Sequence, residues 1–229
     1  MKKQLLKPGP TPKPKAPVRK KAKPAVMPGE MAHVVRIIGG EWKRTKLAVA
    51  DRPGLRPTPD RVRETVFNWL GQDLTGWRCM DAFAGTGALG FEAASRGARE
   101  VTLVERDTAL VAQLKRIQMQ LQASVTQIVR GDGVAALKQL DAGSLDVVFI
   151  DPPFDSVVFD AALQAAARAV APDGFIYLEA PVAWTDEQLE SAGLTVHRHM
   201  KAGAVHAHLL KRRVAAALAP SSTPVPSLV

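Results

Sequence analysis

The sequence has 229 residues but only one cysteine, Cys79, and no long hydrophobic run. A single cysteine excludes disulfides within the chain and zinc sites built from its own cysteines, and it agrees with a reducing compartment. No apolar stretch approaches the roughly 18 residues that span a bilayer, and the N-terminus lacks the apolar segment of a signal peptide. We therefore expect a cytoplasmic protein without membrane contacts.

Acidic residues are absent from positions 1–29, which hold nine lysines and arginines and seven prolines. This segment accounts for the formal net charge of +9, because 22 basic residues balance 22 acidic residues in the rest of the chain. Such a composition cannot build a core, so residues 1–30 are predicted to form a disordered arm. A basic arm suits nucleic acid better than a membrane, and a merely solubilising tail is the alternative.

Two nucleotide-binding signatures are missing as well, namely Gly-x-Gly-x-x-Gly and Gly-Lys-Ser/Thr, which disfavours a dinucleotide or a nucleoside triphosphate as ligand. The chain has instead Asp81-Ala82-Phe83-Ala84-Gly85-Thr86-Gly87, which follows a predicted strand and enters a predicted helix. Glycines at this place allow a tight turn and let a small ligand lie against the backbone at the helix N-terminus. The segment therefore predicts a small-ligand site.

Predicted strands and helices alternate along the chain from residue 78 onward. This order favours an α/β fold, in which a mostly parallel sheet of seven strands carries helices on both faces. The last two strands are too close in sequence for a crossover, so we expect them to form an antiparallel C-terminal hairpin. The predicted strands lie near 78–83, 101–105, 125–130, 145–150, 174–179, 194–201 and 204–212, and the predicted helices lie near 87–97, 107–122, 133–140, 157–171 and 185–192.

The residues before the α/β region predict smaller elements. Residues 31–55 are expected to form a β-hairpin extension with strands at 34–38 and 45–49. A helix at about 59–70 follows, with Thr58 as its N-cap and an apolar stripe that packs on the core. The α/β domain is predicted over 56–213, and residues 214–229 are predicted to form a flexible tail.

Acidic side chains follow consecutive predicted strands. Glu105 ends the second strand of the α/β region, Asp132 follows the third and Asp151 follows the fourth. Because ligands of open α/β sheets bind at the carboxyl ends of the strands, we expect these acids to meet at one edge, Glu105 to accept the hydroxyls of a ribose and Asp132 to meet an adenine amine. Each acid alone has a structural explanation too, such as helix capping by Asp132.

Asp151-Pro152-Pro153-Phe154 follows an apolar run at 145–150 that is typical of a strand buried on both faces. Two consecutive prolines cannot continue a strand within a sheet, so the chain leaves the sheet here. The segment offers a carboxylate, rigid carbonyls and an aromatic ring, which together suit a planar substrate with an amine to donate. Taken alone, the tetrapeptide is equally consistent with a plain strand end.

Basic residues and histidines form two further clusters. Arg36, Lys43, Arg44 and Lys46 lie in the first predicted hairpin with Trp42 among them, which predicts a surface for a nucleic-acid backbone or, alternatively, a solvated face. In the last hairpin, a turn centred on 202–203 makes residue 199 face 206 and residue 197 face 208, so that four histidines share one face. A polar outer face is favoured over a metal site there. These histidines are His197, His199, His206 and His208.

Several segments together resemble one family. They are Arg36-Ile37-Ile38-Gly39-Gly40, Arg56-Pro57-Thr58, Asp60-Arg61-Val62-Arg63-Glu64, Phe67-Asn68, Phe83-Ala84-Gly85-Thr86-Gly87-Ala88-Leu89-Gly90 and Asp151-Pro152-Pro153-Phe154. The chain resembles the RsmD family over about residues 34–212. These bacterial methyltransferases modify the exocyclic N2 amine of one guanine in 16S ribosomal RNA. The segments with Arg36 and Arg56 are the most particular to this family.

The resemblance implies a Rossmann-like class I methyltransferase fold, S-adenosylmethionine as cofactor, ribosomal RNA or the small ribosomal subunit as partner, no metal, and a monomer. Asp151 and the Pro152 carbonyl are implied to accept the hydrogens of the amine, and Phe154 to stack on the flipped base. Asp151 is then an orienting acceptor that needs no raised pKa. The implied cofactor-binding residues are Asp81, Phe83, Gly85, Thr86, Gly87, Glu105, Arg106 and Asp132. The implied RNA-binding residues are Arg36, Lys43, Arg44, Lys46, Arg56, Arg61 and Arg63.

Two other functions stay open at the level of sequence. Asp-Pro-Pro-aromatic motifs also serve methyl transfer to adenine N6 in DNA and to glutamine amides of proteins. The basic residues disfavour a protein acceptor, and the lack of a target-recognition domain disfavours a DNA enzyme. A non-catalytic RNA-binding assembly factor is the third reading, and it is disfavoured because such a protein needs neither Asp151 nor the glycine segment.

Overall fold

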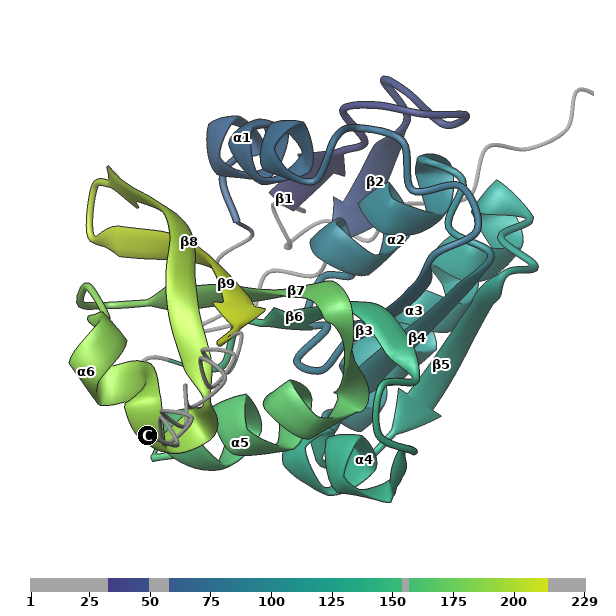
Figure 1. Cartoon of the computed structure of the whole chain (residues 1–229). Coiled ribbons are helices and arrows are strands. Elements are labelled where there is room, and N and C mark those ends of the chain that lie inside the picture. Colours follow the sequence, from purple (N-terminus) through teal and green to yellow (C-terminus); the bar gives the residue numbers. More distant parts are fainter. Residues whose placement is uncertain (1–32, 50–57, 154–156, 214–229) are drawn as a thin grey trace, which may run out of the picture. The chain divides into compact units, whose positions relative to one another are not determined.

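The structure, a computed structural model, describes residues 33–49, 58–153 and 157–213 (Figure 1). The predicted arm at 1–30, the predicted tail at 214–229, and the residues Arg56 and Phe154 lie outside the described residues. Within the described ranges, no helix combines the length and the apolar character needed to cross a bilayer.

A seven-stranded sheet is the central element of the described chain (Figure 1). Its strands are β3 (Arg78–Asp81), β4 (Glu100–Glu105), β5 (Thr126–Arg130), β6 (Leu145–Ile150), β7 (Val170–Ala180), β8 (Leu194–Ala202) and β9 (Val205–Arg212). They are ordered β5-β4-β3-β6-β7-β9-β8. The first five of these strands pair in parallel, whereas β9 is antiparallel to both β7 and β8. The predicted α/β fold with a mostly parallel sheet and a C-terminal antiparallel hairpin is therefore confirmed.

Helices cover both faces of this sheet because its central strands are apolar on both sides. In β6, Val147 and Phe149 belong to one buried cluster, and Val148 and Ile150 belong to the other. Residues of α1, α2 and α3 complete the first cluster, and residues of α4, α5 and α6 complete the second. The helices are α1 (Asp60–Trp69), α2 (Ala88–Ser95), α3 (Thr108–Leu121), α4 (Gly133–Gln139), α5 (Phe159–Ala169) and α6 (Asp186–Leu189), which continues into a 3-10 turn, η1 (Glu190–Ala192).

The C-terminal hairpin has a different register from the predicted one. Ala202 pairs with Val205, so the turn consists of residues 203 and 204 rather than being centred on 202–203. His199 consequently faces His208, not His206. An irregularity between residues 196 and 198 brings His197 against the ring of Phe175, with 6.0 Å between ring centroids, while His208 lies on the opposite face. The prediction that four histidines share one face was wrong for His197.

The predicted N-terminal hairpin is present as a separate two-stranded antiparallel sheet of β1 (His33–Arg36) and β2 (Lys46–Val49). Val35, Ile37, Leu47 and Val49 are buried and join the same apolar cluster as α1 and α2. Since these side chains alternate along the chain, one face of the hairpin packs on the core and the other remains in solvent.

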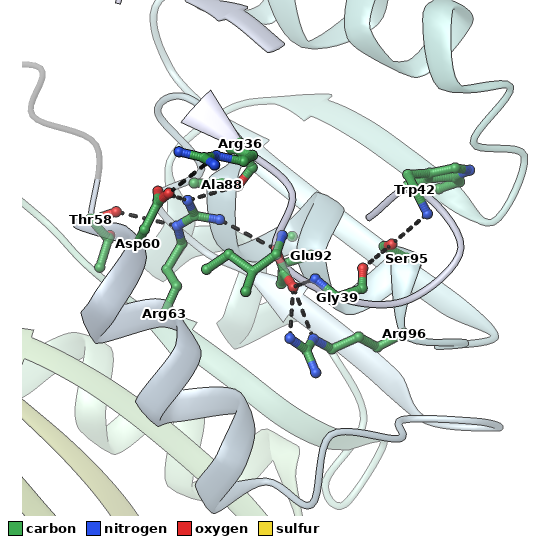
Figure 2. A network of polar contacts seen from close by, with 12 residues as sticks. Arg36, Gly39, Trp42, Thr58, Asp60, Arg63, Ala88, Glu92, Ser95 and Arg96 are labelled. Carbon is green, nitrogen blue, oxygen red and sulfur yellow. Dashed lines mark hydrogen bonds and ion pairs between the residues drawn. The ribbon is translucent and has the colours of Figure 1, made fainter. Parts of the chain in front are cut away.

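A buried carboxylate fastens the hairpin loop to α2 (Figure 2). Glu92 is inaccessible to solvent and accepts hydrogen bonds from the backbone N–H groups of Ile38, at 2.8 Å, and Gly39, at 2.7 Å. It also pairs with the guanidinium groups of Arg63, at 3.3 Å, and Arg96, at 2.9 Å. Such a buried charge is tolerated because four donors replace the water that it has lost.

The loop can approach α2 this closely because it contains two glycines. A Cβ atom on Gly39 would lie 2.4 Å from the Arg96 guanidinium, and one on Gly40 would lie 1.8 Å from the Ser95 carbonyl oxygen. Gly40 also has a φ of +72°, a conformation that favours glycine. In this fit the Ser95 hydroxyl donates to the Gly39 carbonyl at 2.6 Å and accepts from the Trp42 N–H at 3.0 Å.

The start of α1 differs from the sequence prediction. Pro59 is the N-cap and Thr58 makes no capping hydrogen bond. The Thr58 side chain is buried, and its hydroxyl donates to Asp151 at 3.3 Å instead. Proline at the cap position supplies a suitable φ without a side-chain acceptor, which leaves the threonine hydroxyl free to turn toward the sheet.

We expect Glu92→Ala to lower the free energy of unfolding by about 3–5 kcal/mol, because it leaves two buried guanidinium groups and two partly buried N–H groups without their acceptor. Urea unfolding followed by circular dichroism measures this loss. Glu64→Ala, which removes an exposed glutamate of α1, is the control and should change stability by less than about 0.5 kcal/mol. Equal stabilities of the two variants would contradict the role of Glu92.

Candidate functional site

The order of the strands creates a crevice at the carboxyl edge of the sheet. β3 pairs with β4 on one side and with β6 on the other. The chain therefore continues outward in one direction through β4 and β5, and in the opposite direction through β6 and β7. Loops that leave two such neighbouring strands diverge, and ligands of open α/β sheets bind at this point. Here the two diverging loops begin at Asp81 and Asp151.

The glycine loop between β3 and α2 is held by its own backbone. The Ala84 N–H donates to the Val104 carbonyl at 2.9 Å, and the Gly87 N–H donates to the Ala84 carbonyl at 2.6 Å. Gly87 is the N-cap of α2 with a φ of +78°, and a Cβ atom there would lie 2.6 Å from Leu114 and 2.7 Å from Phe91. Only glycine fits this position, and the tight turn aims the N-terminus of α2 at the crevice.

Glu105 lies beside the glycine loop at the end of β4. Its carboxylate accepts from the Gly85 N–H at 2.9 Å and from the Asp107 N–H at 2.8 Å, one bond to each oxygen. Each carboxylate oxygen has a second lone pair, so Glu105 remains able to accept further hydrogen bonds. The two backbone bonds fix the orientation in which it would do so.

Asp81 is a buried acid at the end of β3. One of its oxygens accepts from the Gly90 N–H at 3.0 Å, whereas the other has no hydrogen-bond partner among the described residues. Burial, and to a lesser degree the charge of Glu105, raises the pKa of Asp81 to about 7, although the backbone N–H groups of Gly90 and Phe83 oppose this shift. A buried carboxyl oxygen without a partner is costly and indicates a ligand that donates a hydrogen bond.

The other predicted cofactor-binding residues surround this loop in different ways. Asp132 is exposed and caps α4 by accepting from the Ala135 N–H at 2.8 Å, so the capping explanation holds for one of its oxygens. Thr86 is buried and its hydroxyl accepts from the Ala88 N–H at 3.3 Å. Phe83 is partly buried and Arg106 is exposed.

Asp151 follows β6 at the other side of the crevice. Its side chain is partly buried, Pro152 is buried, and Pro153 is exposed. Burial first, and then the charges of Glu179 and Asp81, raise the pKa of Asp151 well above its usual value, while the bond from Thr58 opposes the shift. This raised pKa was not predicted from the sequence, because both the burial of Asp151 and its proximity to acids on other strands arise only in the folded chain.

Glu179 and Tyr177, near the end of β7, complete an acidic cluster that sequence reasoning missed. Glu179 is 5 % exposed and accepts a hydrogen bond from the Tyr177 hydroxyl at 2.9 Å. Burial raises its pKa, and hydrogen bonds with Tyr177 and Thr58 oppose this shift. Glu179 is the last acid in a predicted strand, and its spacing of two from Tyr177 places both side chains on one face. This signal was available in the sequence.

Most of the predicted RNA-binding residues are exposed. Arg36, Lys43, Arg44 and Lys46 lie on the hairpin and its loop, and Arg36 also pairs with Asp60 at 3.7 Å. Arg61 is exposed at the start of α1. The hairpin cations belong to a segment whose loop is held against α2, and Arg61 follows Thr58 by three residues.

Arg63 was wrongly predicted to contact RNA. Its side chain is inaccessible to solvent, and its guanidinium donates to Glu92, Asp60 and the carbonyls of Arg36 and Thr58. Burial lowers its pKa, while the neighbouring carboxylates oppose the shift. In the sequence Arg63 stands among cations that are exposed, but its ion pair with Glu92 lies in the interior.

Three histidines gather on the outer strands, with ring centroids of His199 lying 5.2 Å from His206 and 4.7 Å from His208. His208 is buried, accepts from the Trp184 N–H at 3.0 Å, and has a pKa lowered to about 4, mainly by burial. In the described ranges no group of three or more histidine, cysteine or acidic side chains is arranged to hold a metal ion.

Comparison with known proteins identifies relatives over most of the chain. A family model described as "Conserved hypothetical protein 95" matches residues 35–211. Ribosomal RNA small subunit methyltransferase D of Escherichia coli (strain K12) is 40% identical over 182 residues, which cover 78% of this chain and 90% of the relative. The enzyme of the same name from Haemophilus influenzae is 38% identical over 177 residues, covering 72% and 92%.

Solved structures agree with these relatives. A candidate methyltransferase named yhhF from Escherichia coli superimposes with a TM-score of 0.68 and 34% sequence identity, covering 79% of this chain and 99% of that one. The sheet and its glycine loop therefore belong to a methyltransferase fold.

The raised pKa of Asp81 predicts how stability depends on pH. Between about pH 4 and pH 7 the folded state keeps a proton that the unfolded chain has already lost, so the free energy of unfolding falls as the pH rises through this range. Asp81→Asn removes this dependence, because asparagine stays neutral. Relative to the unsubstituted protein, the variant should gain on the order of 1–4 kcal/mol between pH 4 and pH 8.

Urea unfolding of the ligand-free protein at the two pH values measures this gain. Comparing the two values cancels any contribution of the asparagine that does not depend on pH. Asp141→Asn, at an exposed aspartate, is the control and should show no such gain. If Asp81→Asn and the unsubstituted protein lose stability in parallel between pH 4 and pH 8, Asp81 does not have the raised pKa.

Proposed function

The chain belongs to the family of ribosomal RNA small subunit methyltransferase D, and we propose that it transfers a methyl group from S-adenosylmethionine to the exocyclic N2 amine of one guanine in 16S ribosomal RNA. The observation that carries this proposal is the position of Asp151 and Pro152, which leave β6 beside the glycine loop of β3. An acceptor for an amine and a cradle for a small cofactor thus share one crevice.

The residues around the glycine loop fit S-adenosylmethionine. The Asp81 oxygen that has no partner among the described residues suits the ammonium group of its methionine part, and the tight turn at Gly87 lets that part lie against the backbone at the start of α2. Glu105, already oriented by two N–H groups, is suited to accept the ribose hydroxyls, and the second oxygen of Asp132, which does not cap α4, is suited to the adenine amine. Phe83, Gly85, Thr86 and Arg106 complete the proposed binding residues. The cofactor supplies a methyl group activated by a positively charged sulfur.

The amine of guanine needs assistance because its lone pair is delocalised into the ring. In the proposed mechanism the Asp151 carboxylate and the Pro152 carbonyl accept its two hydrogens, which favours a pyramidal nitrogen with its lone pair directed at the methyl group. The rigid proline backbone holds both acceptors in place. Phe154, which lies outside the described residues, is proposed to stack on the flipped base.

The exposed cations are proposed to bind the RNA backbone. Arg36, Lys43, Arg44 and Lys46 on the hairpin, together with Arg61 on α1, belong to the same part of the chain as Thr58, which reaches Asp151. Neutralising several phosphates supplies most of the affinity for a nucleic acid and makes it depend on salt. Arg56 belongs to this proposal on sequence grounds alone.

The proposed substrate and cofactor determine in which compartment the reaction takes place. We place the protein in the cytoplasm, where small ribosomal subunits are assembled, and propose that it acts as a monomer on the subunit or its RNA. Neither the acceptor role of Asp151 nor the transfer of a methyl group from sulfonium requires a metal.

We expect Asp151→Ala to reduce methyl transfer at least about 100-fold, because the amine loses its charged acceptor, while cofactor binding measured by calorimetry stays within about threefold. Transfer is measured with labelled S-adenosylmethionine and undermethylated small ribosomal subunits. A parallel loss of transfer and of cofactor binding would overturn the assignment of Asp151 to the amine.

The same assay separates the possible acceptors. Undermethylated subunits, naked 16S ribosomal RNA and DNA are offered in turn, and the modified nucleotide is mapped. Label on a guanine N2 of ribosomal RNA is the expected result. Label on adenine N6 or on DNA would contradict the proposed acceptor, and no label on any of the three would contradict an enzymatic function.

The double variant Lys43→Ala, Lys46→Ala should weaken binding of 16S ribosomal RNA and reduce the slope of log affinity against log salt concentration by about 2, because two phosphate contacts are lost. Filter binding at several salt concentrations measures both. Lys115→Ala, at an exposed lysine of α3, is the matched control and should leave the slope unchanged. An unchanged slope in the double variant would exclude the hairpin as the RNA surface.

A further inference from the structure

Two carboxyl groups, those of the partly buried Asp151 and the buried Glu179, lie with one hydroxyl at the reacting edge. Asp151 follows β6, Glu179 lies near the end of β7, and these strands pair in parallel. Ile150 pairs with Leu178, so Asp151 and Glu179 each follow a paired position on neighbouring strands. The Thr58 hydroxyl donates to an Asp151 oxygen at 3.3 Å, and its interaction with Glu179 lowers the pKa of that carboxyl. Glu179 and Thr58 are both 5 % exposed, so solvent has little access to the bridge.

The number of hydrogens limits the protonation states of these three groups. A threonine hydroxyl has one hydrogen, so it cannot donate to two carboxylates at once. When it donates to Asp151, its bond with Glu179 needs a hydrogen from the Glu179 carboxyl. When it donates to Glu179, its bond with Asp151 needs a hydrogen from Asp151. Both bonds exist together only if the two acids carry one proton between them.

The surroundings of Asp151 and Glu179 also favour a state in which the two acids carry one proton between them. The charged and titratable groups of the described residues that act on the pair are Asp81, on the neighbouring strand β3, and Tyr177, on β7. Burial raises the pKa of both carboxyls, and the repulsion between them raises that of Asp151 further. Like charges this close do not both ionise readily, as in other enzymes with paired carboxyl groups.

We propose that Asp151 and Glu179 share one proton across the Thr58 hydroxyl, and that binding of the substrate amine at Asp151 moves this proton to Glu179 and leaves Asp151 charged. The inference rests on the proposed methyl transfer to an amine. The proton leaves the Asp151 carboxyl for the Thr58 oxygen, and the hydrogen of Thr58 passes to Glu179. Glu179 and Thr58 are thus positioning residues, which act on the substrate through Asp151.

This arrangement reconciles two requirements at one residue. An uncompensated Asp151 anion in a buried acidic cluster is costly in the free enzyme, yet only the anion accepts the amine hydrogens well. Two N–H hydrogens from the substrate stabilise the Asp151 anion, and Glu179 stores the proton without release to solvent. The Tyr177 hydroxyl, which donates to Glu179 at 2.9 Å, stabilises Glu179 when it is the charged partner.

Substrate-free titration is the first test. Glutamate side-chain carboxyl carbons are labelled with ¹³C, and the Glu179 signal is assigned by its loss in Glu179→Gln. In the unsubstituted protein this signal should titrate well above the usual pH of a glutamate, and in Asp151→Asn its midpoint should fall by at least about one pH unit, because the second acid is gone. An unchanged midpoint in Asp151→Asn would overturn the shared proton.

The pH dependence of kcat for methyl transfer is the second test. Glu179→Gln keeps a neutral hydrogen-bond donor for Thr58 but removes the second charge, so the acid limb of the profile should move to lower pH by about one unit. Thr58→Val breaks the bridge and should lower kcat at least about tenfold with little change in either KM, whereas Thr58→Ser should stay within about threefold. Thermal unfolding establishes that each variant is folded.

Glu187→Gln, at an exposed glutamate of α6, is the control and should leave the profile unmoved. A profile of Glu179→Gln that coincides with that of the unsubstituted protein, or equal kcat values for Thr58→Val and Thr58→Ser, would overturn the relay. If the unsubstituted protein methylates no ribosomal RNA, the proposed function fails, and the titration of Glu179 still decides whether the proton is shared.

Discussion

The buried Glu92 carboxylate is the interaction on which the geometry of the N-terminal part depends. It binds the hairpin loop through two N–H groups and holds Arg63 in the interior. Arg63 in turn donates to the Thr58 carbonyl at 3.2 Å. Because a buried charge without its partners costs several kcal/mol, these contacts form together or not at all. The exposed cations of the hairpin and the Thr58 hydroxyl are therefore positioned by one side chain of α2.

The second constraint is the reversal of strand order at β3 and β6. It brings the glycine loop and the Asp151 turn to one crevice, although 63 or more residues separate them in the sequence. Parallel pairing in register places Asp81 opposite Phe149, two residues before Asp151. Cofactor-binding and amine-binding groups thus become neighbours through backbone hydrogen bonds alone. Substitutions of side chains in the two loops therefore leave the loops next to each other.

The elements that were predictable from sequence are those specified by local patterns. Buried strands such as 145–150, the glycine turn at 85–87 and the double proline after Asp151 each have one compatible backbone path, so the fold and the edge of the site followed from them. Arg63 was misplaced because its partner Glu92 is 29 residues away and in a different helix. The histidine register depended on a two-residue turn at 203–204, which shifts every pair in the hairpin.

Thr58 shows why the remaining part of the site was not predictable. By local rules a threonine before Pro-Asp is a helix cap, and only the folded chain reveals that its hydroxyl turns to Asp151 while its carbonyl accepts from Arg63. Thr58 thereby connects two groups of residues: the Glu92 network that holds the hairpin, and the pair of acids at the reacting edge. Since Thr58 is fixed at both its carbonyl and its hydroxyl, a shift of α1 relative to α2 must also change the hydrogen bond to Asp151. The position of the Asp151 carboxyl therefore depends on the position of the basic hairpin, because Thr58 is bonded to both parts of the structure.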